Sequence, residues 1–247
     1  MGVMTQMRDV PAQTGDLDLP RIEPDAGMSK TLHNGLEILE LLARNPHGLS
    51  VSEIAESLDV HRTVAHRLVR TLEAHRLCRR DDHKRISLGT GLVTLAESVE
   101  QDLRTLARPI LEDLADSVEA TAHLVVRESD TMVRAIMVIE PRRSDVHIAF
   151  RPGQVHPLDR GSAGLAILGS MPPRPDERPE VTRARQTGYA VSAGEVVSTT
   201  IGISQRCPTR PGGTQAAIGV SVFDAADEAR LAAAVVSAAA ALGDLLR

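Results

Sequence analysis

The chain has 247 residues, with 42% hydrophobic and 25% charged side chains and a formal net charge of −5, so it is long enough for one or two domains with their own cores. Aromatic residues make up only 1% of the chain and tryptophan is absent, which argues against modules that bind RNA or single strands by stacking on bases. Two distant cysteines, Cys78 and Cys207, exclude a disulfide framework and a CxxC metal pair and fit a reducing compartment.

The N-terminal segment divides into a tail and a helix. Residues 1–28 hold two basic residues against five acids and are rich in Pro, Gly and Asp, a composition that predicts a disordered tail. The following segment, 32–42, repeats leucine at helical spacing, at Leu32, Leu36, Leu39 and Leu42. This periodicity predicts an amphipathic helix.

Two further short helices, joined by a tight corner, are predicted between residues 49 and 77. The first begins at Ser50-x-x-Glu53, a capping box in which the two residues satisfy each other's free backbone donors. A corner at Asp59-Val60 leads into the second helix. Its apolar residues recur at helical spacing, at Ala65, Leu68, Val69 and Leu72. This arrangement is typical of a helix-turn-helix.

The opposite side of the second helix is basic. Arg62, His66 and Arg70 are four residues apart and therefore share one exposed face. A helix of this size fits the major groove of DNA, where arginines and hydroxyls bind phosphate and guanine. We therefore expect the following side chains to contact duplex DNA: Ser52, Arg62, Thr63, His66, Arg67, Arg70, Lys84 and Arg85.

Residues 78–88 predict two short strands around a charged turn, which would complete a winged helix. Residues 60–85 hold eight Arg or Lys against three acids, a local charge of +5 in a chain whose total is −5. Local positive charge of this kind is what binding to phosphates requires. A solvated face without a ligand is the alternative for any single basic helix, but three helices, a cap and a basic wing in this order favour DNA.

A helical pattern returns from Gly91 to about Glu119, with apolar residues in phase before Arg108-Pro109. We expect the part over 90–107 to be a linker helix between two domains that also helps two chains to associate.

The rest of the chain alternates short β segments with helices, which predicts an α+β domain built on a twisted antiparallel sheet with a concave face. Strands are predicted at 121–128, 131–140, 145–150, 200–206 and 214–223, and helices near 161–170, 177–187 and 226–246.

The segment from Asp159 to Gly164 is the candidate ligand site of this domain. Its small residues leave backbone amides open, and the helix that follows directs its positive end there, which favours a carboxylate or phosphate. An ordinary glycine-containing helix start is the alternative. The proposed site residues are Asp159, Gly161, Ser162, Ala163, Gly164, Cys207 and Ser221, with His123 as a further candidate; for Cys207 and His123 a plain core role is the alternative.

Several classes of protein lack support in the sequence. No GxSxG, P-loop or GxGxxG motif indicates catalysis, and no paired histidines and cysteines indicate a metal, so we expect no catalytic residues, metal or cofactor. The longest apolar run, 232–243, is too short and alanine-rich for a bilayer span, and no signal peptide is evident. We expect a cytoplasmic protein without a membrane partner.

The order of these segments resembles the IclR-type transcriptional regulators. The resemblance lies in GLSVSEIAESLDV (48–60), HRTVAHRLVRTLEAHRL (61–77), RISLG (85–89), ARPILEDLADSVEATAHLVV (107–126), GQVHPLDRGSAGLAIL (153–168) and AAIGVSV (216–222). The chain departs from the usual family pattern at Asp59, where a glycine is usual, and in the short, proline-rich segment 171–187.

The resemblance implies an N-terminal winged helix-turn-helix over 29–89 and, over 108–247, an effector-binding and oligomerisation domain related to GAF and PAS sensors. It implies a homodimer or dimer of dimers on an operator. We therefore predict a sequence-specific DNA-binding regulator, a repressor, whose operator binding responds to a small-molecule effector such as an organic acid. One alternative is a winged-helix module for protein contacts, which salt-dependent duplex binding would separate from the regulator. The other is a DNA-tethered enzyme.

Overall fold

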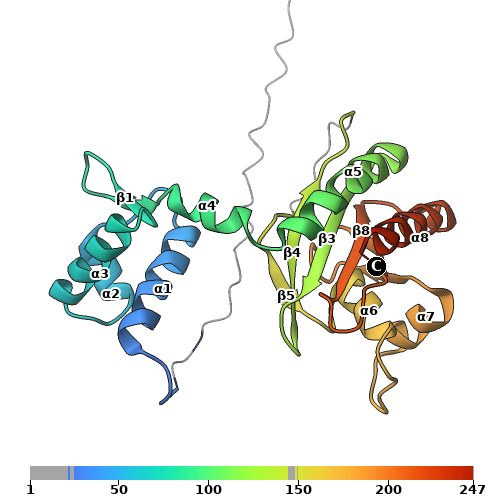
Figure 1. Cartoon of the computed structure of the whole chain (residues 1–247), viewed down its shortest axis with the longest axis horizontal. Helices are drawn as coiled ribbons and strands as arrows, with labels where there is room; N and C mark the ends of the chain where they lie inside the picture. Colours follow the sequence, from blue (N-terminus) through green and yellow to red (C-terminus); the bar gives the residue numbers. More distant parts are fainter. Residues whose placement is uncertain (1–21, 23–24, 144–147, 149, 247) are drawn as a thin grey trace, which may run out of the picture.

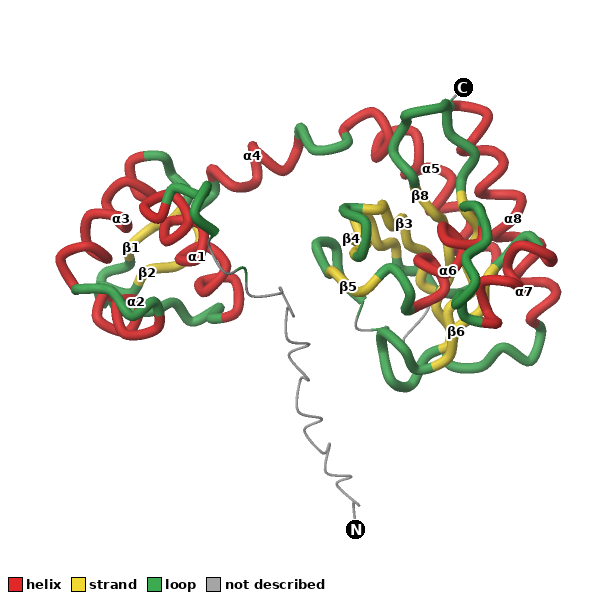
Figure 2. Tube along the Cα trace, turned by 90° about the horizontal axis from the view of Figure 1, so that it is seen from below, coloured by secondary structure: helices red, strands yellow, loops and turns green. Residues whose placement is uncertain are grey.

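The computed structural model describes residues 22, 25–143, 148 and 150–246. An N-terminal body of helices with a two-stranded sheet and a larger body built on a six-stranded sheet are joined by helix α4 (Figures 1 and 2). None of the described helices has the length and apolarity that crossing a bilayer requires.

The N-terminal body is the predicted winged helix-turn-helix. Its elements are α1 (Lys30–Arg44), α2 (Val51–Ser57), α3 (Arg62–Ala74), β1 (Cys78–Arg80) and β2 (Ile86–Leu88). Ile38, Ile54, Val69 and Ile86 are fully buried and join all three helices to the wing. The capping box at Ser50 and Glu53 is confirmed, with both of its hydrogen bonds present.

Only the second half of the leucine repeat of α1 packs on this core, because Leu42 is buried in it and Leu39 is partly buried against it. Leu32 and Leu36 are exposed, at 63% and 51%, whereas Asn34, Gly35, Ile38 and Leu42 are buried. The helix is amphipathic as predicted, but it also carries leucine on the side that faces away from its own domain.

The helix predicted from Gly91 to about Glu119 is two helices. Helix α4 (Gly91–Glu97) ends before Ser98, and α5 (Gln101–Val118) begins after Glu100, whose φ of 47° is left-handed. Pro109 lies inside α5 and does not end it, because the apolar face of that helix packs against the sheet and offsets the lost hydrogen bond. The boundary expected at 107/108 therefore falls within one continuous helix.

The larger body is built on one antiparallel sheet with strand order β5-β4-β3-β8-β7-β6. Its strands are β3 (Thr121–Arg127), β4 (Met132–Ile139), β5 (Val155–Pro157), β6 (Ala190–Ala193), β7 (Ile201–Arg206) and β8 (Ala216–Val222). The structure confirms the four long predicted strands, whereas the predicted strand 145–150 lies mostly outside the described residues. Strands β5 and β6 were not predicted, because edge strands of three or four residues are too short to show an alternating pattern.

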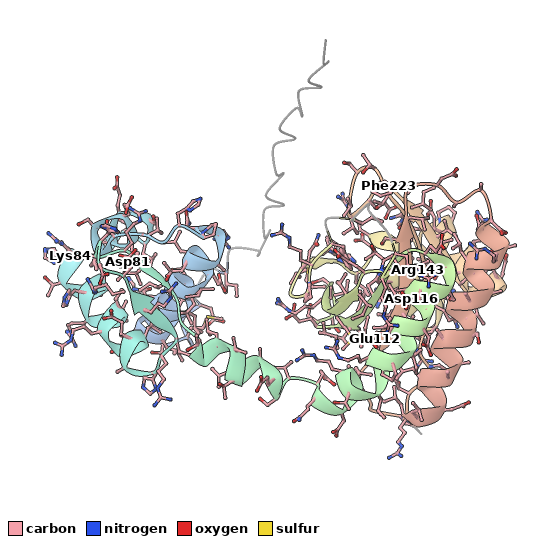
Figure 3. All side chains as sticks on the ribbon, turned by 90° about the horizontal axis from the view of Figure 1, so that it is seen from above. Asp81, Lys84, Glu112, Asp116, Arg143 and Phe223 are labelled. Atoms are coloured by element: carbon pink, nitrogen blue, oxygen red, sulfur yellow. The ribbon has the colours of Figure 1, made fainter. Side chains whose placement is uncertain are left out.

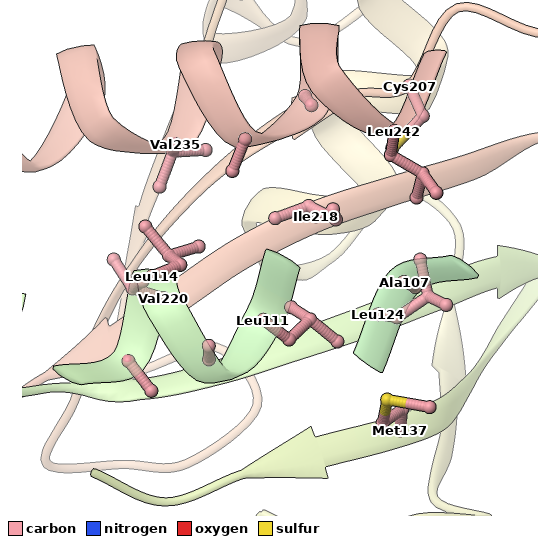
Figure 4. Close-up of a cluster of buried hydrophobic side chains, with 14 of the residues drawn as sticks. Ala107, Leu111, Leu114, Leu124, Met137, Cys207, Ile218, Val220, Val235 and Leu242 are labelled. Carbon is pink, nitrogen blue, oxygen red and sulfur yellow. The ribbon is translucent and has the colours of Figure 1, made fainter. Parts of the chain in front are cut away.

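Helices cover both faces of this sheet. Helices α5 and α8 (Glu228–Leu245) pack side by side over one face, and α6 (Gly161–Gly169) and α7 (Pro179–Thr187) lie over the other (Figure 1). The three helices predicted here are confirmed. Figure 4 shows the core under α5 and α8, where Leu111, Ile218 and Leu242 meet and where Cys207 also lies.

Candidate nucleic-acid interface and sheet cavity

The start of α3 is fixed by local interactions. Asp59, with φ at 49°, makes the left-handed corner before the helix, and Val60 donates its N–H to the Ala55 carbonyl. His61 then caps α3 by accepting the Thr63 N–H at 3.3 Å. An Asp adopts this conformation more readily than most residues other than glycine, so the corner forms despite the departure from the family pattern.

Helix α3 buries its apolar side and exposes its basic side, as predicted. The buried residues are Ala65, Leu68, Val69 and Leu72, and the exposed ones are Arg62, Thr63, His66, Arg67 and Arg70. Ser52 on α2 is exposed as well. Within the described part of the chain, the guanidinium groups of Arg62, Arg67 and Arg70 form neither a hydrogen bond nor an ion pair, so this face has charge available for a ligand.

The two predicted DNA contacts in the wing, Lys84 and Arg85, point in different directions. The Asp81 carboxylate accepts the N–H groups of His83 and Arg85 at 2.9 and 2.8 Å and shapes the turn, and Lys84 is exposed at its tip beside Asp81 (Figure 3). Arg85 instead turns inward. Its Nε donates to the carbonyl of Gly48 at 3.1 Å, and a guanidinium nitrogen lies 3.7 Å from Glu53. Arg85 therefore braces the wing against the start of α2.

A small cavity lies on the sheet face that α6 covers, at the N-terminus of this helix. Its volume is about 30 Å³, roughly the volume of a single water molecule. Its walls come from α6, from strands β3, β5, β6, β7 and β8, and from the loop between β6 and β7. The lining residues are His123, Val125, Phe150, His156, Gly161, Ser162, Ala163, Ser192, Glu195, Val196, Thr200, Gly202 and Ser221.

Five of the predicted ligand-site residues meet in this cavity: Gly161, Ser162, Ala163, Ser221 and His123. The other three do not. Asp159 is exposed outside it, and Gly164 packs so closely on the Leu158 backbone that it leaves no room for a side chain. Cys207 lies in the core on the opposite face of the sheet, where burial raises the pKa of its thiol to about 12.

A chain of hydrogen bonds joins two lining residues of the cavity, Ser162 and His123, through the buried Ser204. The hydroxyls of Ser162 and Ser204 lie 2.7 Å apart, and the His123 Nε2 is 3.3 Å from the Ser204 hydroxyl. Glycine makes this possible, because a Cβ at Gly202 would lie 2.6 Å from the Ser162 hydroxyl. The missing side chain at Gly202 of β7 thus leaves room for the Ser162 hydroxyl of α6.

Two buried histidines face this cavity in the neutral form. Burial lowers the pKa of His123 to about 3, with a further contribution from His156, and burial lowers the pKa of His156 to about 4. The His123 Nδ1 and both ring nitrogens of His156 have no hydrogen-bond partner among the described residues. They are therefore open to a polar ligand. His156 could not be found from the sequence, since a single histidine within a three-residue edge strand shows no pattern.

A charged group that was not predicted, the carboxylate of Glu195, closes the cavity. Glu195 follows Gly194 in the loop between β6 and β7 and accepts the N–H of Gly161 at 2.8 Å. Arg178, just before α7, donates to its other carboxylate oxygen at 2.7 Å. The hydrogen bond from Arg178 lowers the pKa of Glu195. Three segments far apart in sequence create this arrangement, so no local motif could have indicated it.

Comparisons with known proteins agree with this division of the chain. The model of the IclR helix-turn-helix domain matches residues 31–82, and that of the bacterial transcriptional regulator IclR C-terminal domain matches residues 96–178. Together these matches span more than half of the 247 residues.

Similar proteins are regulators of transcription. The HTH-type transcriptional regulator KipR of Bacillus subtilis is 25% identical over 78% of this chain and 85% of its own length. The glycerol operon regulatory protein of Streptomyces griseus is 29% identical over 66% of this chain, which spans 65% of that protein.

Solved structures show the same fold. An IclR transcriptional regulator from Alicyclobacillus acidocaldarius superposes with a TM-score of 0.75 at 24% identity, covering 89% of this chain and all of that one. An IclR homologue from Microbacterium hydrocarbonoxydans, solved with 4-hydroxybenzoate, gives a TM-score of 0.73 at 21% identity over 88% of this chain and 99% of that one. The chain therefore belongs to the IclR family of transcriptional regulators, with a DNA-binding helix-turn-helix domain followed by an effector-binding C-terminal domain.

Proposed function

We propose that this chain is a homodimeric, sequence-specific repressor that a small carboxylate effector releases from its operator. The observation that carries the proposal is the outer face of α3, where three arginines are exposed and unpaired within the described part of the chain. Exposed arginines are well hydrated without a partner, and they gain favourable interactions when they contact DNA phosphates and base edges.

Helix α3 would enter the major groove with its first two turns toward the bases. Arg62, Thr63 and His66 would reach base edges, and Arg67 and Arg70 would contact bases or phosphates. Ser52 on α2 and Lys84 on the wing would bind the DNA phosphate backbone on either side of the groove that α3 enters. Because its guanidinium is held by Gly48, we assign Arg85 to supporting the wing rather than to the DNA.

Association of two chains would follow from the apolar side chains left exposed near the linker. Leu32 and Leu36 of α1 and Val93, Leu95 and Val99 in and after α4 are each more than half exposed. Burying them against a second copy would gain roughly 25 cal/mol per Å² of apolar surface. A two-fold dimer would then place two α3 helices on a pseudo-palindromic operator.

Regulation would start in the sheet cavity. A carboxylate effector suits it because the N-terminus of α6 already binds a carboxylate, that of Glu195. The 4-hydroxybenzoate complex of the Microbacterium homologue supports an organic acid as ligand. The effector would act by binding better to the conformation with low operator affinity.

The first experiment is binding of the purified protein to DNA fragments from around its own gene, at two salt concentrations and with random duplex as competitor. We expect selective retention of one fragment and a loss of affinity at the higher salt concentration. Retention no better than that of random duplex would contradict the proposal and favour a winged helix used for protein contacts.

A further inference from the structure

The effector position in the proposed function is occupied by a side chain of the protein itself. Gly161 is the first residue of α6, and its N–H points at the Glu195 carboxylate, 2.8 Å away. Helix N-termini carry a partial positive charge and bind anions there. Glu195 therefore takes the place that an anionic ligand would need.

Arg178 holds Glu195 in this place. Two of its guanidinium nitrogens donate to the two carboxylate oxygens of Glu195, at 2.7 and 3.2 Å, and one also donates to the Asp159 carbonyl at 2.7 Å. Glu180 competes for the same arginine from 3.2 Å but does not reach Gly161. The contact is thus a carboxylate site complete in itself, with a helix N-terminus on one side and a guanidinium on the other.

The occupied cavity has no room for an effector. Its volume is about 30 Å³, whereas small-molecule sites usually measure several hundred Å³. Val196 packs beside Gly161, so that a Cβ added there would lie 2.6 Å from the valine methyl. Residues 194–200, which we term the Glu195 loop, must move before a ligand can enter.

An independent observation places further ligand-directed groups beside the same helix. His156 is 7% exposed and lines the cavity, and neither of its ring nitrogens has a partner among the described residues. Its Nε2 would lie only 3.2 Å from a Cβ on Gly161, so it is adjacent to the N-terminus of α6. A carboxylate bound there would bring a neighbouring hydroxyl or carbonyl oxygen within reach of His156.

We propose that Glu195 is an internal competitor of the effector. A small acid with a hydroxyl or carbonyl oxygen next to its carboxylate takes over the contacts of Glu195 with Gly161 and Arg178 once the Glu195 loop moves away. This inference rests on the proposed function, because it concerns regulation of the same cavity. It has a measurable consequence, since the apparent Kd of a ligand rises in proportion as the binding-competent state becomes rarer.

The test uses acetate and glycolate as probes of the full-length protein and of the variant Glu195→Ala. Binding is followed by calorimetry and by the NMR shift of the Gly161 amide. If the competent state is one in ten or fewer, Glu195→Ala binds glycolate at least about tenfold more tightly than the wild type, and glycolate binds more tightly than acetate. The matched control Glu180→Ala removes the other carboxylate from Arg178 and leaves glycolate affinity unchanged or lower.

Equal glycolate affinities of the wild type and Glu195→Ala, or no binding to either, would overturn the proposal. Glu195→Gln keeps the side-chain volume and loses the charge, so it decides the matter if the alanine variant does not fold, and its expected affinity is intermediate. Operator binding by the same variants separates the two proposals. Tight glycolate binding without any change in operator affinity would contradict the proposed regulation and leave the competition by Glu195 intact.

Discussion

The outer face of α3 and the N-terminus of α6 both present groups that attract negative charge, but only those at α6 have a partner within the described part of the chain. On α3 the arginines are exposed and lack ion pairs within the described residues, whereas at α6 the Gly161 N–H and Arg178 are already bound to Glu195. An exposed arginine remains hydrated at little cost, but a half-buried donor without a partner costs on the order of 1–3 kcal/mol. The arginines on α3 can therefore remain unpaired in water, whereas the donors at the N-terminus of α6 need a partner from the protein itself, which is Glu195.

The largest expected effect is a loss of stability on adding a side chain at Gly164 of α6. In Gly164→Val the new side chain would collide with the Leu158 backbone, so the substitution should destabilise the sheet domain by about 3 kcal/mol rather than affect the ligand alone. Thermal unfolding followed by circular dichroism measures this change. Gly35→Ala in α1, where a Cβ meets nothing within 4 Å, is the control and should not destabilise the protein.

The outer face of α3 is tested by removing its positive charges one at a time. Arg67→Ala and Arg70→Ala should each lower operator affinity by about tenfold or more, because a base contact contributes roughly 1–3 kcal/mol, and a phosphate contact also reduces the salt dependence by about one ion. Fluorescence anisotropy at several salt concentrations measures both quantities. Unchanged affinity in both variants, with unchanged melting temperature, would exclude α3 as the helix that contacts the operator.

The two buried histidines of the sheet cavity should make the stability of the protein depend on pH. The pKa values of His123 and His156 fall from 6.5 to about 3 and about 4 in the folded protein. The unfolded chain therefore binds more protons below pH 6.5, and the stability of the sheet domain decreases as the pH falls from 6.5 toward 5, by up to about 1.4 kcal/mol per pH unit for each histidine.

Urea unfolding between pH 7.5 and 5, above the range in which most carboxylates titrate, measures this slope. His156→Gln should reduce it, and His75→Gln, at an exposed position outside the cavity, should not. A slope that stays the same in His156→Gln would show that folding does not lower the pKa of this histidine.

The smallest effects distinguish the two neighbouring cations of the wing. Lys84→Ala should lower operator affinity by a few fold without changing stability, because a single phosphate contact is lost. Arg85→Ala should instead lower the unfolding free energy by about 1 kcal/mol, because the Gly48 carbonyl loses its donor. The reverse result, with Arg85→Ala affecting only DNA binding, would place Arg85 on the operator.

The exposed basic face of α3 could be predicted from the sequence because one helix supplies it. The spacing of Arg62, His66 and Arg70 against Leu68 and Leu72 is sufficient to place these residues on opposite sides of an α-helix. The inward turn of Arg85 could not be predicted, because its contact with Gly48 joins positions 37 residues apart.

The cavity could be predicted only in part. Gly161, Ser162 and Ala163 were found because a run of small residues before a helix is a local feature. Cys207 was placed wrongly, because its side of the sheet depends on how β7 leaves its pairing with β8.

By itself, the sequence determined most of the helices, the four long strands and the buried and exposed sides of α3, since residues three and four apart share one side of a helix. It did not reveal the short edge strands β5 and β6 or the break between α4 and α5. It also determined the family, through the order of the segments. Tertiary structure alone decided that Glu195, Arg178 and Gly161 meet and that His156 lies beside them. These contacts depend on strand order and loop packing, which join residues 17 and 34 positions apart in the chain and which no local spacing encodes.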